Sequence, residues 1–229
     1  MVLTGEYGKD GIAGSTANGS ALCYVRNDLP NAFTGTVTVE VIHFKTGKTS
    51  RLSTAPVSLP GGGGAMGFFC ACNSTRISSG KPDQCPTFDQ LYTQVGCDNG
   101  AAGCMLNVTV ARSRSSQDAG TTGTMSRSML PLTKPSNFHL PPARIAHAVK
   151  FAANGSSTVS VILRTNATAI YVWLSTTEQG RFSDNAIVLL PGEVTVVDFL
   201  SFVETGTSSA ALETSLRVEH LAMYLDAGL

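Results

Sequence analysis

The sequence predicts an all-β protein that consists of two tandem β-sandwich domains. Its composition is the first observation: only 14% of the 229 residues are charged, whereas Thr, Ser, Gly, Ala and Val are abundant, as is typical of β-rich extracellular sandwiches. The second is that short segments of alternating apolar and polar residues recur between turn sequences. No segment keeps a helical apolar stripe over four turns, and the chain is long enough to bury two cores.

We expect the first domain over residues 21–140. Strand-like segments begin with ALCYVRN and continue in TVTVEVIHF, in which three valines alternate with polar residues. KTGK then predicts a hairpin, and the four glycines at 61–64 predict a flexible loop. A cysteine-bearing insertion without periodicity follows over residues 73–103, and the prolines within 124–140 suit an edge strand.

We expect the second domain over residues 143–229, after the linker Pro141-Pro142, because two prolines stop strand pairing and stiffen a connection. Its strand-like segments follow one another at short spacing, which is typical of a sandwich. They are ARIAHAVKF, STVSVILRT, TAIYVWLST, NAIVLLPG, EVTVVDFL and LETSLRVEHLAMYL. Residues 1–20 are polar and Gly-rich and predict a disordered leader or the remnant of an upstream region.

All the cysteines lie in the first domain and predict disulfides there rather than a metal site. No pair has C-x-x-C spacing, and no histidine stands at ligand distance from them along the chain. The disulfide candidates are Cys23, Cys70, Cys72, Cys85, Cys97 and Cys104. Cys97 and Cys104 could close a short loop. Cys70 or Cys72 could pair with Cys85, but six cysteines permit many connectivities and the sequence does not choose among them.

Asn-X-Ser/Thr sequons also indicate the secretory pathway, because N-glycosylation and disulfide formation share a compartment. The glycosylation candidates are Asn18, Asn73, Asn107, Asn154 and Asn166. The N-terminus has no signal-peptide pattern, and no window is apolar enough to span a membrane. We therefore expect a piece of a longer secretory protein, lysosomal or extracellular.

Charge and motif patterns exclude several classes of function. Sixteen basic and sixteen acidic residues balance without runs, which argues against nucleic acid or an anionic membrane as a partner. TGKTS lacks the leading glycine of a phosphate-binding loop and predicts a hairpin turn. The four histidines are scattered, the carboxylates lie mostly in loops or on outward strand positions, and no metal, other cofactor or catalytic residue is expected.

The single tryptophan, Trp173, lies in the apolar run IYVWL. It could serve as a sugar-stacking platform or as a core residue between two sheets. We predict the core position, since sandwich cores commonly hold one tryptophan.

The most specific stretch is YVWLSTTEQGRFSDNAIVLLPGEVTVV, residues 171–197. It is similar to the C-terminal immunoglobulin-like domain of β-mannosidases in glycoside hydrolase family 2. LETSLRVEHLAMY resembles the closing strand of that domain, and YVRNDLPNAFTGTVTVEVIHF and CDNGAAGCMLNVTV resemble the immunoglobulin-like domain that precedes it. The resemblance implies two tandem immunoglobulin-like β-sandwich domains.

The resemblance also implies a function for a parent enzyme, an exo-acting retaining hydrolase that removes terminal β-linked mannose in the lysosome or outside the cell. Its catalytic glutamates belong to a (β/α)₈ barrel, for which this chain has neither the length nor the alternating helices. We therefore expect a non-catalytic accessory region whose partners are the missing catalytic barrel and N-linked glycans. The alternative is a free-standing carbohydrate-binding or adhesion module, which the small number of aromatic residues disfavours.

The resemblance includes a loop motif made of Gly180, Arg181, Phe182, Ser183, Asp184 and Asn185. We expect Asp184 and Asn185 to cap backbone amides, Phe182 to anchor the loop in the core, and Arg181 to be available for a carboxylate. The main interpretation is structural. A second hypothesis is that this loop docks against the barrel.

Overall fold

The computed structural model describes residues 2–5, 22–69, 88–112, 124–151, 159–203 and 209–225. Strands dominate these residues, and they pair into antiparallel sheets, so the prediction of an all-β fold is confirmed. No helix within the described ranges is long and apolar enough to cross a membrane. The chain divides into two compact units: unit 1 contains residues 1–43 and 48–139, and unit 2 contains residues 44–47 and 140–229.

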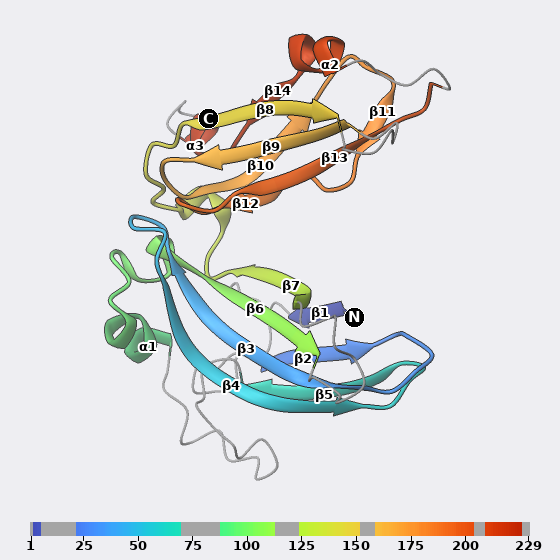
Figure 1. The fold of residues 1–229 in the computed structure, drawn as a ribbon. Coiled ribbons are helices and arrows are strands. Elements are labelled where there is room, and N and C mark those ends of the chain that lie inside the picture. Colours follow the sequence, from blue (N-terminus) through green and yellow to red (C-terminus); the bar gives the residue numbers. More distant parts are fainter. Residues whose placement is uncertain are drawn as a thin grey trace. The chain divides into compact units, whose positions relative to one another are not determined.

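Unit 1 is built on a four-stranded sheet with the order β4-β3-β6-β7 (Figure 1). Its strands are β3 (Phe33–His43), β4 (Thr49–Leu59), β6 (Cys104–Arg112) and β7 (Thr124–Pro131). Val37, Val39 and Val41 are fully buried, because period-two alternation sends them to the core face of β3. Strand β7, which ends at Pro131, lies at the edge of the sheet, as its proline predicts.

A three-stranded sheet with the order β1-β2-β5 completes unit 1. Its strands are β1 (Val2–Gly5), β2 (Leu22–Asn27) and β5 (Gly64–Phe69). Strand β1 lies within residues 1–20, for which the sequence predicts a disordered leader or the remnant of an upstream region, and residues 2–5 form a paired strand there. Because β5 pairs with one side of β2 only, the other side offers backbone groups with which β1 pairs.

The glycine run at 61–64 forms a hydrogen-bonded turn between β4 and β5, so the prediction of a flexible loop is wrong. The amide of Gly62 donates to Leu29 O at 2.8 Å, and the amide of Gly63 donates to Asn27 O at 2.8 Å. Gly62 and Gly63 have φ angles of 74° and 103°, which glycine adopts without steric cost. The insertion between β5 and β6 contains helices that the sequence did not predict, α1 (Phe88–Val95) and the 3₁₀ turn η3 (Gly100–Gly103).

Unit 2 consists of two antiparallel sheets with the orders β11-β13-β9-β8 and β12-β10-β14 (Figure 1). The first contains β8 (Ile145–Phe151), β9 (Val159–Thr165), β11 (Gly180–Phe182) and β13 (Thr195–Ser201). The second contains β10 (Ala169–Ser175), β12 (Ile187–Leu189) and β14 (Arg217–Glu219). Val161, Leu163 and Phe199 from the first sheet form one core with Val172 and Leu174 from the second.

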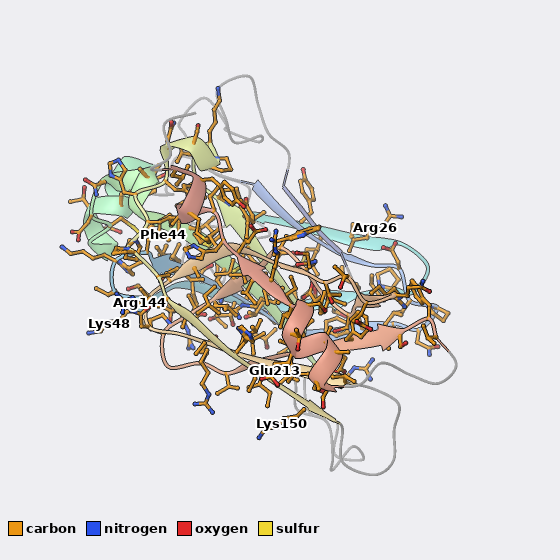
Figure 2. The ribbon with its side chains drawn as sticks, turned by 90° about the horizontal axis from the view of Figure 1, so that it is seen from above. Arg26, Phe44, Lys48, Arg144, Lys150 and Glu213 are labelled. Carbon is orange, nitrogen blue, oxygen red and sulfur yellow. A yellow bond between two sulfur atoms is a disulfide. The ribbon has the colours of Figure 1, made fainter. Side chains whose placement is uncertain are left out.

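The last predicted strand of unit 2 is wrong over most of its length. Residues 212–225 fold as the end of α2 (Ser209–Ser215), the short strand β14, and α3 (Ala222–Leu225). The alternation of apolar and polar residues corresponds to a strand only around β14, and Leu212 is a buried residue of helix α2. Helix α2 contacts β8, and the charged residues Glu213 and Lys150 of these two elements are exposed (Figure 2).

Candidate functional site

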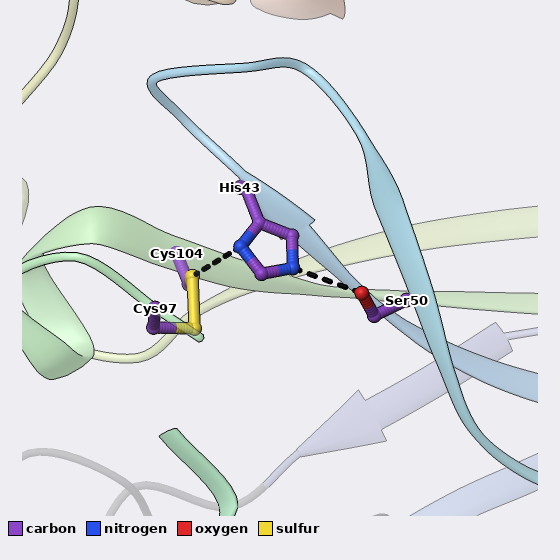
Figure 3. Close-up of a disulfide and its surroundings, with 4 residues drawn as sticks. All are labelled: His43, Ser50, Cys97 and Cys104. Atoms are coloured by element: carbon purple, nitrogen blue, oxygen red, sulfur yellow. Dashed lines mark hydrogen bonds between the residues drawn. A yellow bond between two sulfur atoms is a disulfide. The ribbon is translucent and has the colours of Figure 1, made fainter. Parts of the chain in front are cut away.

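Unit 1 contains a cluster of a disulfide and a histidine (Figure 3). Cys97 and Cys104 form a disulfide, and their Cα atoms lie 5.9 Å apart. This pairing, which closes a short loop, is one of those that the sequence left open. His43 Nδ1 lies 3.9 Å from Cys104 Sγ, and His43 Nε2 lies 3.0 Å from Ser50 Oγ. The other cysteine candidates are not defined: Cys70, Cys72 and Cys85 lie outside the described residues, and only the backbone of Cys23 is described.

The sequence did not predict the proximity of His43, because 61 residues separate it from Cys104. Strand register brings them together, since His43 and Cys104 are paired residues of β3 and β6. The ligand atoms of His43, Cys97 and Cys104 lie within 4.8 Å of one another. Both sulfur atoms belong to the disulfide, so these residues could bind a metal only after reduction, when thiolates become available.

The loop motif of unit 2 begins as strand β11, which pairs with β13. A Cβ atom at Gly180 would lie 2.3 Å from the ring of Phe199 and 2.6 Å from Leu200 O, so only glycine fits at this position. The rings of Phe182 and Phe199 have their centroids 5.3 Å apart, and Phe182 packs against the core of unit 2. Arg181 is exposed and pairs in register with Leu200.

The second half of the motif connects the two sheets of unit 2. Asn185 Oδ1 accepts the Leu174 amide at 2.7 Å, and Asn185 Nδ2 donates to Leu174 O at 2.9 Å. Leu174 belongs to β10, so one side chain satisfies both backbone groups of a residue in the second sheet. Ser183 bonds to the first sheet: its amide donates to Asp198 O at 2.7 Å, and its Oγ accepts the Asp198 amide at 3.0 Å.

Asp184 contributes less than its neighbours in the motif. It is exposed, and its Oδ1 accepts the amide of Asn185 at 2.8 Å. Asn185 also accepts the amide of Ala186 at 3.1 Å, where φ is 54°. Asn185 is therefore the residue that fixes the path of the chain between the sheets.

A further group of side chains lies on the outer face of β10 and β14. It includes Trp173, for which the predicted core position is wrong. This residue is 51% exposed, whereas the sequence predicts a core position. The strand register shifts between Ala169 and Val172, and Tyr171 between them has a φ of 51°. This bulge inverts the alternation, so that Val172 and Leu174 enter the core and Trp173 faces outward.

Opposite Trp173 on the neighbouring strand lies a carboxylate that bonds to a second aromatic residue. Glu219 of β14 is the cross-strand partner of Trp173, and its Oε1 accepts the hydroxyl of Tyr224 at 2.8 Å. Tyr224 is 48% exposed. Its pKa is raised above the ordinary value mainly by this hydrogen bond, with smaller contributions from desolvation and the charge of Glu219, while the charge of Arg217 opposes the rise.

The sequons differ in their accessibility. Asn107 is only 3% exposed, its Nδ2 donates to Glu40 at 3.1 Å, and its Oδ1 accepts Arg127 Nε at 2.8 Å. In the folded unit, the Asn107 nitrogen that a glycan would modify is therefore buried in a hydrogen bond. Asn166 is exposed. The remaining sequon residues, Asn18, Asn73 and Asn154, lie outside the described residues.

The carboxylates in strand interiors are engaged with neighbouring side chains. Glu40 bonds to Asn107 and lies 3.9 Å from Arg51, and Asp198 accepts Ser160 Oγ at 2.7 Å. Of the histidines outside the disulfide cluster, His220 is buried, and desolvation lowers its pKa while an interaction with the Ala143 backbone opposes the shift. His147 is exposed on β8.

Comparisons with known proteins identify the architecture. The family model Ig_mannosidase, described as an Ig-fold domain, matches residues 140–223. The structure of β-D-mannosidase from Dictyoglomus thermophilum aligns with a TM-score of 0.60 and 13% identity, over 96% of this chain and 21% of that one. Exo-chitosanase CsxA E541A from Amycolatopsis orientalis, in complex with PNP-β-D-glucosamine, aligns with a TM-score of 0.50 and 16% identity, over 96% of this chain and 25% of that one.

No curated protein sequence matches the chain. The chain spans between a fifth and a quarter of the length of the two solved structures described above. At sequence identities of 13% and 16%, this likeness establishes the fold. The family match lies within unit 2 and includes the loop motif at residues 180–185. Residues 140–223 thus match the Ig-fold domain model of the mannosidase type, in agreement with the sequence resemblance.

Proposed function

We propose that the chain is a non-catalytic accessory region of a β-mannosidase-like glycoside hydrolase and that it supports the catalytic barrel. The match of residues 140–223 to the mannosidase Ig-fold model carries this proposal. The parent enzyme would release terminal β-linked mannose from oligosaccharides or glycoproteins, in the lysosome or outside the cell. The alignment with only 21% of a β-D-mannosidase structure agrees with an accessory part of a larger enzyme.

The carboxylates favour a supporting role over a catalytic one. Glycoside hydrolysis uses two carboxyl groups about 5 to 10 Å apart on either side of the bond that is cleaved. Glu40 and Asp198 are held by side chains of their own sheets, and Glu219 is held by Tyr224 at an outer face. None of these arrangements is an opposed pair.

The surface that we assign to the barrel is an apolar row on β13, which we define as Val196 of this strand and the flanking residues Val194 and Phe202. Val194, Val196 and Phe202 are 48%, 56% and 68% exposed. Val196 faces away from the core because its neighbour Val197 is buried in the core. Arg181 lies beside Leu200 in the same sheet. Exposed apolar surface with a polar margin is typical of a face that another domain covers.

A substitution at Phe202 tests this proposal. Phe202→Asp should leave the melting temperature of the purified chain within about 2 °C of wild type, because changes at exposed positions cost under about 0.5 kcal/mol. In the β-mannosidase that contains the chain, the same substitution should shorten the half-life of activity at elevated temperature. Leu29→Asp, at a position 44% exposed in unit 1, is the matched control and should have no effect on either. An unchanged half-life with Phe202→Asp would refute docking through this surface.

A further inference from the structure

The cluster on the outer face of β10 and β14 is organised by strand register. Trp173 and Glu219 are directly opposed residues of antiparallel strands, which places their Cβ atoms about 5 Å apart on one side of the sheet. Leu174, the neighbour of Trp173, is buried in the core, and its partner Val218 packs against that core. Trp173 and Glu219 therefore both point away from the core, and helix α3 supplies Tyr224 to the same carboxylate.

Both aromatic residues are exposed where burial would be expected. Trp173 and Tyr224 are 51% and 48% exposed, although an indole or phenol ring contributes most to stability when it is buried. The side chain of Arg217, two residues before Glu219 on β14, is exposed and acts electrostatically on Tyr224. The surface thus combines two aromatic rings, one acid group and one basic group. We call these four residues, Trp173, Arg217, Glu219 and Tyr224, the aromatic–carboxylate surface.

We propose that the aromatic–carboxylate surface binds a neutral hexopyranoside. A pyranoside has one face of C–H groups and an edge of hydroxyl groups, and this surface presents the matching partners. The indole of Trp173 can pack against the C–H face, while Glu219 accepts hydroxyl protons and Arg217 donates to hydroxyl oxygens. Because the acid and base balance, a neutral ligand fits better than a charged one.

The hydrogen bond from Tyr224 prepares the carboxylate for this role. It occupies one acceptor position on Oε1 of Glu219, and an ionised carboxylate has about four such positions. Holding the side chain in one orientation before binding reduces the entropy lost when the ligand arrives. The proposal does not depend on the proposed function, because it concerns binding by this chain alone.

Tryptophan fluorescence provides the experiment, since Trp173 is the only tryptophan in the chain. The intact chain is titrated with methyl β-D-mannopyranoside and with β-1,4-mannobiose. We expect a saturable change in emission with a Kd of about 1 mM, which is suited to a small open surface. Sorbitol at equal concentrations has hydroxyl groups but no ring face and should give no saturable change.

Variants assign the binding to the surface. Glu219→Gln should raise the Kd at least about tenfold, because hydrogen bonds to charged groups are the stronger ones. Tyr224→Ala should also weaken binding, whereas Phe202→Ala, which changes another exposed aromatic residue of unit 2, should leave the Kd unchanged. Trp173→Ala is followed by saturation-transfer NMR on the sugar and should lose the signal. Near-ultraviolet circular dichroism establishes that each variant is folded.

Three outcomes would overturn the proposal. They are the absence of a saturable change in the wild-type chain, a response to sorbitol equal to the response to the mannosides, and an unaltered Kd in Glu219→Gln. The last of these would mean that Trp173 senses a ligand bound elsewhere. A variant that fails to fold does not remove the test, because the sorbitol comparison uses the wild-type protein alone.

Discussion

At the scale of single residues, Asn185 has the most consequential polar side chain of the loop motif. It forms both hydrogen bonds of the Leu174 backbone at a point where β12, which pairs with β10 as far as Val172, has not yet begun. The asparagine side chain therefore stands where a neighbouring strand would otherwise supply a peptide group. The identity of this residue follows from that geometry, since aspartate would accept but could not donate.

Asn185→Ala should destabilise unit 2 by about 2 to 3 kcal/mol, because the side chain loses its three hydrogen bonds and two backbone groups of Leu174 lose their partner. The expected decrease in melting temperature is about 10 °C for a domain of this size. Asp184→Ala removes one exposed hydrogen bond and should lower it by only a few degrees. Thermal unfolding followed by circular dichroism measures both, and an equal effect of the two substitutions would contradict the role given to Asn185.

His220 makes the stability of unit 2 sensitive to acid. Burial lowers its pKa below the ordinary histidine value of 6.5, so between the two pKa values the unfolded chain binds more protons than the folded one. The free energy of unfolding is therefore not reduced by His220 above about pH 6.5, and it decreases as the pH falls below that value. Melting temperatures from pH 7.5 to 5 should fall less steeply in His220→Gln than in wild type. His147→Gln, at an exposed position, should keep the wild-type slope, and an unchanged slope in His220→Gln would contradict the assignment.

At the scale of elements, the sequence predicted strands well where alternation was regular. Val37, Val39 and Val41 on β3, and Val159, Val161 and Leu163 on β9, lie in the cores as their spacing predicts. The segment around Trp173 shows why burial could not be predicted where this alternation was missing. All its residues are apolar, so the side of the sheet that each occupies depends on the bulge at Tyr171, and a local backbone conformation of that kind leaves no periodic signal.

Register explains the other omissions. His43 meets Cys104 only because β3 and β6 pair as they do, and Glu219 meets Trp173 only because β14 pairs with β10. Non-local pairing of this kind is set by the whole sheet, so separation along the chain gives no indication of it. The structural role of the loop motif was easier to anticipate, since asparagine and aspartate in a loop commonly bond to backbone groups nearby.

The disulfide between Cys97 and Cys104 joins the segment after α1 to the first residue of β6 and closes the loop that contains η3. Closing a loop of this length stabilises a domain by about 2 to 3 kcal/mol in the chain-entropy model. Cys97→Ser combined with Cys104→Ser should therefore lower the melting temperature of unit 1 and leave that of unit 2 unchanged, because the two hydrophobic cores share no residue. Differential scanning calorimetry resolves the two effects. Equal destabilisation of both units would contradict the prediction that the disulfide stabilises unit 1 alone.

At the scale of the whole molecule, the chain combines two units built mainly of antiparallel strands, and unit 2 carries both surfaces to which we assign a binding role. The apolar row on β13 and the aromatic–carboxylate surface lie in different sheets of unit 2. A barrel could therefore contact the first of these surfaces without using the residues that we assign to a pyranoside. Support of the enzyme and recognition of a sugar are separable properties in this account.

Isolation of the protein from its source cells tests the central claim most directly. An antibody raised against residues 140–223 is used to precipitate the protein, and the turnover of p-nitrophenyl β-D-mannopyranoside by the precipitate is measured beside that of the purified 229-residue chain. We predict turnover by the precipitate and none by the purified chain, because our proposal assigns the catalytic carboxylates to the barrel. An inactive precipitate would contradict the assignment to a β-mannosidase, and turnover by the purified chain that disappears when one of its own Glu or Asp residues is changed would contradict its accessory role.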